Sequence, residues 1–464
     1  MRLPALVFAA VAACALAVPA SGALPLRTGI SDLGELDGPN ASLAADRIRA
    51  TGSTFVRTQL TWSEVAPTKP ANATDPADPA YNWTTFDRRL QLLKAHGLEP
   101  LVTVYYSPAW GTFGTSPTPN VAALAQFMRA AALRYSGRYQ GLPRVRYWEI
   151  WNEPNASRYL APQFKNKKAW SPSYYRRMVN AAADAIHAVR PDDDVVAGAF
   201  TPFTRRFKDF IAIGPLKFMA QMLCMSPGPH PHPTCKAKMH FDIISTHPYT
   251  SGGPTHHAQN PDDVSLGDLP KMRRLLNASI KAGKIVSKRR IRFWVTEFSW
   301  DSAPPDPTAV PMKIHARWTS QALYVMWKNG IDLCIWLQLR DVPISEGFNQ
   351  GGLYFDGKTF ADDRPKLSME AYRFPLVAFR HGKRATIWGR TPKSNAGVVS
   401  ILQSSSTGWH QLARLRANRY GIFQGSIALR GSTGSLEAKL ANERSVPFSL
   451  KRVKDFFINP FGDK

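Results

Sequence analysis

Short apolar runs alternate with longer segments of helical periodicity between Pro25 and Pro375. The apolar runs are rich in β-branched and aromatic residues, so we expect strands at 26–31, 54–58, 98–105, 145–151, 194–199, 241–246, 291–296 and 332–338. Helical patterns lie between them, for example at 84–96, 121–138, 174–189, 269–282 and 312–329, and most of these end at Gly or Pro. Eight strands that alternate with helices predict an α/β fold in which a parallel sheet closes into a (β/α)8 TIM barrel.

The pattern changes after Pro375. Short alternating runs separated by Gly, Ser and Asn turns occur at 386–389, 398–403, 410–414, 423–428, 436–440 and 447–450. This spacing is typical of a β-sandwich. We therefore predict a barrel domain over residues 24–375 and a small β-sandwich domain over residues 376–464.

The N-terminus predicts export. Met1 and Arg2 precede an apolar run over residues 3–18 and small residues at 20–23, which is the pattern of a secretory signal peptide over residues 1–23. No later apolar stretch has the roughly 20 residues needed to cross a membrane. We expect a secreted protein, extracellular or periplasmic, without a membrane span.

The cysteines fit an oxidising compartment. Cys224 and Cys235 bracket a loop rich in Pro and Gly, which favours a disulfide bond that closes this loop. A metal site with His230 and His232 is the alternative, but the spacing matches neither common zinc pattern. Cys334 lies in an apolar run and is expected to be a buried thiol.

The chain is strongly basic, with a net charge of +25. Residues 376–464 hold 15 Lys and Arg against 4 Asp and Glu, a difference of +11. Such a field attracts anionic polymers, although a solvated face that serves solubility explains the charge equally well. Because the basic residues form no nucleic-acid motif, we expect no nucleic acid as a partner.

Two predicted strands end at glutamates. The run Arg146–Asn155 places Glu153 after Asn152, and the strand at 291–296 is followed by Glu297. A pair of carboxyl groups at the same end of a barrel suits hydrolysis of a glycosidic bond, one as proton donor and one as nucleophile or base. The alternative is that both glutamates are solvated strand ends.

The chain resembles the clan A glycoside hydrolases over roughly residues 24–375. The runs 149–155, 244–249 and 296–298 look most like family 39, which includes β-xylosidases and α-L-iduronidase, and family 5 endoglycosidases are the second candidate. Tyr105 and Tyr106 stand where family 5 usually has a histidine, which favours family 39. The resemblance implies that Glu153 is the general acid/base and Glu297 the nucleophile of a retaining enzyme.

Five further residues are candidates for substrate binding. Asn152 would donate to the sugar 2-hydroxyl. His247 and Tyr249 lie two positions apart and would face the nucleophile and the sugar. Arg57 would keep Glu297 ionised. Trp336 would stack on a sugar ring. The alternative for Asn152 is an ordinary strand-end amide, and for His247 a core histidine. The alternative for Arg57 is a structural ion pair, and for Trp336 packing within the barrel.

These observations predict a glycosidase that acts on a β-linked oligo- or polysaccharide, with an anionic glycan as one class of substrate. Two carboxyl groups and water suffice for this chemistry, so the sequence implies neither a metal nor an organic cofactor. A catalytically silent barrel that binds an envelope polysaccharide is the competing function. Sugar identity, linkage, exo or endo cleavage and oligomeric state are left open.

Overall fold

The computed structural model describes residues 25–113, 117–207, 209–346, 350–453 and 456–458. The predicted signal peptide, residues 1–23, lies outside the described residues. Eight parallel strands form a closed barrel in the order β1-β16-β13-β11-β7-β4-β3-β2. They are β1 (Arg27–Ser31), β2 (Phe55–Thr61), β3 (Glu99–Tyr105), β4 (Tyr147–Ile150), β7 (Asp194–Phe200), β11 (Ile243–Thr246), β13 (Arg292–Val295) and β16 (Leu333–Trp336). The predicted (β/α)8 fold class is confirmed.

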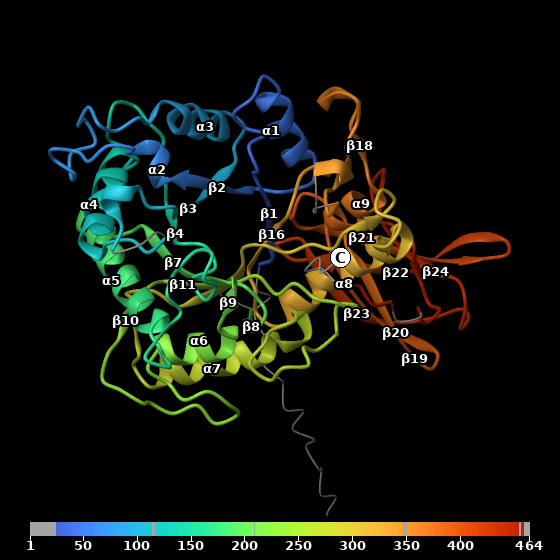
Figure 1. Ribbon diagram of the computed structural model, residues 1–464. Helices are drawn as coiled ribbons and strands as arrows, with labels where there is room; N and C mark the ends of the chain where they lie inside the picture. Colours follow the sequence, from blue (N-terminus) through green and yellow to red (C-terminus); the bar gives the residue numbers. More distant parts are fainter. Residues whose placement is uncertain (1–24, 114–116, 208, 347–349, 454–455, 459–464) are drawn as a thin grey trace, which may run out of the picture.

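Helices surround the barrel, as Figure 1 shows. They are α1 (Ala41–Ala50), α2 (Trp62–Val65), α3 (Thr84–Ala95), α4 (Val121–Arg134), α5 (Ser171–Val189), α6 (Pro215–Met222), α7 (Leu269–Lys281), α8 (Met312–Lys328) and α9 (Leu367–Arg373). Helix α5 begins three residues before the predicted start, because Pro172 is suited to the first helical turn.

The barrel interior is layered. Eight buried residues, one or two from each strand except β1, form an apolar cluster: Phe55, Leu101, Tyr147, Val196, Ile243, Trp294, Leu333 and Ile335. Successive inward side chains on a strand are two residues apart. The next inward positions on β2, β3, β4 and β11 are polar: Arg57, Thr103, Glu149 and Ser245. A polar layer therefore lies above the apolar layer, toward the carboxyl ends of the strands.

Pairs of two-residue strands form small sheets outside the barrel sheet. After β4 and β7 come the hairpins β5 (Phe164–Lys165) with β6 (Lys168–Ala169) and β8 (Arg205–Arg206) with β9 (Ile211–Ala212). The other pairs are β10 (Met239–His240) with β12 (Ile285–Val286), β14 (Ser302–Ala303) with β15 (Val310–Pro311), and β17 (Tyr354–Phe355) with β18 (Arg364–Pro365). The sequence patterns did not predict them, because two residues show no periodicity.

The chain from Leu376 onward forms two antiparallel sheets. One sheet contains β19 (Leu376–His381), β20 (Arg384–Arg390) and β23 (Ile422–Ala428). The other contains β21 (Gly397–Ser405), β22 (Gly408–Ala417), β24 (Ser435–Leu440), β25 (Glu443–Arg444) and β26 (Phe448–Ser449). Figure 1 shows these strands, orange to red, beside α8 and α9.

Aromatic rings and a buried arginine join the sheets to the barrel. Trp388 of β20 lies 5.5 Å from the ring of Tyr324 and 5.6 Å from that of Trp327, both on α8. Arg390 is fully buried and donates to the carbonyl of Leu26 at 3.0 Å and to the hydroxyl of Thr28 at 3.1 Å. The sandwich therefore covers part of the barrel surface.

The described cysteines form one disulfide bond and one free thiol, as predicted. Cys224 and Cys235 are bonded, with their Cα atoms 5.1 Å apart, so the alternative of a metal site at these residues is wrong. Cys334 is buried, and burial raises the pKa of its thiol to about 12. Among the described residues, no helix has the length and apolar character that crossing a membrane requires.

Candidate active site

Glu153 and Glu297 lie together at the carboxyl ends of β4 and β13. Trp151 and Glu153 both adopt positive φ angles, 74° and 41°, which are uncommon for residues other than glycine. The Glu153 amide donates to the carbonyl of Ala199 at 2.9 Å, which fixes this turn against β7. The side chain of Glu153 is 17% exposed to solvent, and that of Glu297 is 19% exposed. They are therefore accessible, whereas the groups behind them are buried.

Arg57 connects the polar layer to Glu297. Its Nη1 donates to Oε2 of Glu297 at 2.9 Å, its Nε to Oε2 of Glu149 at 2.8 Å, and its Nη2 to Oδ1 of Asn152 at 2.8 Å. Burial alone would lower the pKa of Arg57, but the charges of Glu149 and Glu297 raise it. The guanidinium is therefore a fixed positive charge beside Glu297.

Glu149 is a site residue to which the sequence reasoning gave no role. It is fully buried and accepts hydrogen bonds from Thr103 at 2.8 Å and Ser245 at 2.9 Å, as well as from Arg57. Burial raises its pKa, but the charges of Arg57 and His247 and the hydrogen bonds from Arg57 and Thr103 together outweigh burial, and the net shift is downward. A signal was present in the sequence, because a charged residue at 149 interrupts the apolar and aromatic run of the predicted strand.

His247 lies beside Glu153. Its Nδ1 is 3.2 Å from Oε1 of Glu153 and 3.9 Å from Oε2 of Glu297. The ring is completely buried, and burial lowers its pKa although Glu153 acts in the opposite direction. Among the side-chain atoms that the structure describes, Nε2 of His247 is buried without a hydrogen-bond partner. A neutral imidazole therefore faces Glu153.

Tyr249 contacts Glu297, and Asn152 contacts Arg57. The Tyr249 hydroxyl donates to Oε1 of Glu297 at 2.7 Å, and its ring stacks on Phe298 with centroids 6.1 Å apart. Burial and the charge of Glu297 raise the pKa of this phenol, so it stays protonated as a donor. Because Oδ1 of Asn152 accepts from Arg57, the amide nitrogen of Asn152 remains for another acceptor.

Trp336 does not line the cleft, so the expected stacking on a sugar is wrong. The side chain has no exposed surface. It points from β16 toward the helices, with its ring 6.0 Å from His315 of α8 and 5.6 Å from Tyr372 of α9. Its neighbours Leu333 and Ile335 occupy the inward positions of the strand. The alternative of barrel packing is the observed arrangement.

Tyrosines supply an aromatic wall that the sequence reasoning did not assign to the site. Tyr106 lies 4.2 Å from Tyr105 and 6.1 Å from Tyr159, measured between ring centroids. Burial, together with the nearby charges of Glu153 and Glu297, raises the pKa of Tyr159. Tyr159 therefore lies within electrostatic range of both carboxylates.

The site does not suit a cation. One ligand atom each from Glu153, His247 and Glu297 lie within 4.8 Å of one another, which is compatible with metal binding. However, Arg57 and Tyr249 already donate to the two oxygens of Glu297, and Arg57 adds a positive charge. A metal ion at this place would be repelled by that guanidinium.

Paired carboxylates at the carboxyl ends of the strands of a (β/α)8 barrel are the arrangement with which glycoside hydrolases cleave glycosidic bonds. The chain belongs to glycosyl hydrolases family 39, whose family model matches residues 55–313. It is therefore a glycoside hydrolase, and family 39 is favoured over family 5, as the resemblance suggested. The alternative of a catalytically silent binding protein is not supported by this assignment.

Two solved structures are similar to this chain. The GH39 enzyme from Xanthomonas axonopodis pv. citri superimposes with a TM-score of 0.51 at 16% identity, covering 88% of this chain and 92% of that chain. A glucosidase from Croceicoccus marinus gives a TM-score of 0.48 at 15% identity, covering 88% of this chain and 93% of that chain. No curated protein matches the chain.

Proposed function

We propose that the protein is an exported retaining glycosidase that cleaves β-linked glycans, with Glu297 as nucleophile and Glu153 as general acid/base. The observation that carries this proposal is the short distance between the carboxylates, since an oxygen of each lies within 4.8 Å of the other. Retaining enzymes hold the two carboxyl groups about 5–5.5 Å apart, whereas inverting enzymes leave roughly 6.5–9.5 Å for a water molecule.

The surroundings of the two glutamates differ in the way that these roles require. Glu297 accepts hydrogen bonds from Arg57 and Tyr249, which orient its two oxygens for attack as a nucleophile. Glu153 lies beside the ring of His247, with its Oε1 3.2 Å from Nδ1, and among the described residues no ion pair joins it to Arg57. Asn152 has its amide nitrogen available for the sugar 2-hydroxyl.

The reaction proceeds in two displacements. Glu297 attacks the anomeric carbon and the glycosidic bond breaks, while the proton of Glu153 passes to the leaving oxygen. Water then attacks the glycosyl ester, its proton returns to Glu153, and Glu297 is released as a carboxylate. The disulfide bond and the apolar N-terminal run support export of the enzyme.

Hydrolysis of a panel of aryl β-glycosides, followed by NMR of the product, tests the proposal. The wild-type enzyme should release the β-anomer first. Glu297→Ala should lose at least about 10³-fold in kcat. Glu153→Ala should retain bond cleavage with activated leaving groups and regain turnover with azide, which forms a β-glycosyl azide.

Glu370→Gln is the matched control, because this carboxylate is 44% exposed and outside the site. It should leave kcat unchanged. Initial release of the α-anomer would show inversion and overturn the mechanism. Wild-type turnover by Glu297→Ala would overturn the assignment of the nucleophile.

A further inference from the structure

A basic cavity of about 740 Å³ lies between the barrel and the sandwich. Its walls come from the residues just before and at the start of β13, from Asp332 before β16, from α7, and from the loop 418–420 between β22 and β23. Arg292 begins β13, and Glu297 lies five residues further along at the opposite end of the barrel. At about 3.3 Å per residue positions 292 and 297 are roughly 16 Å apart along the chain, so the cavity and the catalytic carboxylates lie at opposite ends of the barrel.

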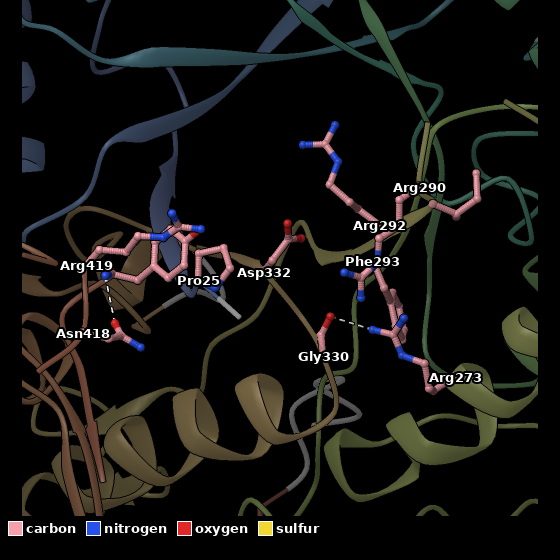
Figure 2. Close-up of a pocket in the computed structure, with 11 residues that line it drawn as sticks. Pro25, Arg273, Arg290, Arg292, Phe293, Gly330, Asp332, Asn418 and Arg419 are labelled. Atoms are coloured by element: carbon pink, nitrogen blue, oxygen red, sulfur yellow. Dashed lines mark hydrogen bonds between the residues drawn. The ribbon is translucent and has the colours of Figure 1, made fainter. Parts of the chain in front are cut away.

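Four arginines line this cavity, which we call the arginine pocket: Arg273, Arg290, Arg292 and Arg419. Figure 2 shows Arg419 on one side, Arg273, Arg290 and Arg292 on the other, and Asp332 between them. Asp332 is the only carboxylate among the lining residues that the structure describes. Burial raises the pKa of Asp332, and its carboxylate already pairs with Arg27 at 3.5 Å.

Arg273 is held in place by neutral groups. Its guanidinium lies 4.9 Å from the Phe293 ring centroid, and it donates to the carbonyls of Asn329 at 3.0 Å and Gly330 at 2.6 Å. Burial lowers the pKa of Arg273, Asp332 raises it, and neighbouring Arg290 lowers it again. The carbonyls therefore orient this cation without removing its charge.

The remaining arginines differ in how they are paired. Arg292 forms an ion pair with Asp194 at 2.8 Å. Arg290 and Arg419 are exposed, and within the described residues neither forms an ion pair with a carboxylate. Arg419 lies instead over the ring of Tyr420, 4.8 Å from its centroid. Two guanidinium groups therefore retain their planar sets of donors for a ligand.

We propose that the arginine pocket binds an anionic sugar through its carboxylate or phosphate group. Guanidinium groups match both oxyanions because they donate two parallel hydrogen bonds. The ring of Tyr420 and the apolar surfaces of Pro25 and Ile291 provide contacts for the body of a sugar. A volume of this size accommodates small ligands. The site is separate from the catalytic cleft, so it does not depend on the proposed mechanism.

Calorimetric titration at low salt tests this site with three ligands: a trimer of a uronic acid, a hexose phosphate and a neutral trisaccharide. The double substitution Arg290→Gln and Arg419→Gln removes the two unpaired guanidinium groups. The matched control replaces two exposed arginines outside the pocket, Arg49→Gln and Arg414→Gln, and so removes the same charge.

The wild type and the control should bind at least one anionic ligand, and the pocket variant should bind it about tenfold or more weakly, the change expected from a lost charge-assisted contact. The ligand that binds more tightly identifies the oxyanion. Equal affinity in the pocket and control variants would overturn the site. The site would also be overturned if the wild type bound the neutral trisaccharide as tightly as the anionic ligands. It would likewise be overturned if the wild type bound neither anionic ligand.

Discussion

Glu297 is held through both of its oxygens, one by Arg57 and the other by Tyr249. Tyr249→Phe removes one donor and keeps the ring that packs on Phe298. A hydrogen bond to a charged group contributes about 1.5–3 kcal/mol, so kcat should fall roughly 10- to 100-fold. Steady-state kinetics would measure this, with Tyr139→Phe as the control for loss of a phenol outside the site. An unchanged kcat would show that Tyr249 does not position the nucleophile.

Glu149 and Arg57 form a buried ion pair, and Arg57 in turn donates to Glu297. Glu149→Gln leaves the guanidinium without that charge and should lower the free energy of unfolding at pH 7 by about 3 kcal/mol. The pKa of Glu149 is lowered in the folded protein, so its stabilisation is present above the unfolded pKa of about 4.3 and is lost as pH falls through the folded pKa. The difference between variant and wild type should therefore shrink in acid.

Urea denaturation at pH 7 and in a series below pH 5 would measure this difference. Glu370→Gln should change stability by less than about 0.5 kcal/mol, because its carboxylate is exposed. A difference between Glu149→Gln and the wild type that is the same at every pH would contradict the role of the ionised pair.

The positions of Glu153 and Glu297 could be predicted because each follows an apolar strand, and the carboxyl ends of parallel strands meet at one end of a barrel. The direction in which Trp336 points could not. A strand with apolar residues at every position, such as β16, does not reveal which of its alternate faces is inward. Its neighbours on α8 and α9 determine this, and they are distant in sequence.

Helix α8 and strand β20 form one of the contacts between the barrel and the sandwich. Trp388 is 1% exposed at this contact, whereas Trp409 on β22 is 38% exposed. Trp388→Ala should therefore lower the free energy of unfolding by about 3–5 kcal/mol, the cost of removing a buried aromatic side chain. Trp409→Ala, the control for loss of an indole, should cost less than about 0.5 kcal/mol. Equal effects in chemical denaturation would show that this contact does not stabilise the fold.

Long barrel elements were predictable, whereas the two-residue strands in the loops were not. Strand β3 and helix α4 have enough residues to show a pattern of apolar positions. The hairpin β8–β9 contacts the loop that follows Glu153, because the amide of Ser157 donates to the carbonyl of Ile211 at 2.7 Å. Two-residue strands form only through such contacts, so local sequence gives no signal for them.

At the scale of the whole molecule, the net charge of +25 produces a field that extends beyond any single site. The excess of 15 basic over 4 acidic residues in the segment 376–464 adds to it. Retention of the protein on a uronate-rich polymer should therefore exceed retention on neutral xylan at low salt. It should weaken as the Debye length falls from about 10 Å at 0.1 M to about 3 Å at 1 M salt.

Affinity electrophoresis of the Glu297→Gln variant, which should leave the polymers intact, would measure this retention across the salt range. A field that arises from the total charge should fall by the same small amount in both double variants, Arg290→Gln with Arg419→Gln and Arg49→Gln with Arg414→Gln. The arginine pocket should add a further loss in the first of these pairs. Retention that is equal on both polymers and insensitive to salt would mean that the positive charge serves only to solvate the surface. In that case neither the field nor the pocket recruits an anionic glycan, because both forms of attraction must weaken as salt is added.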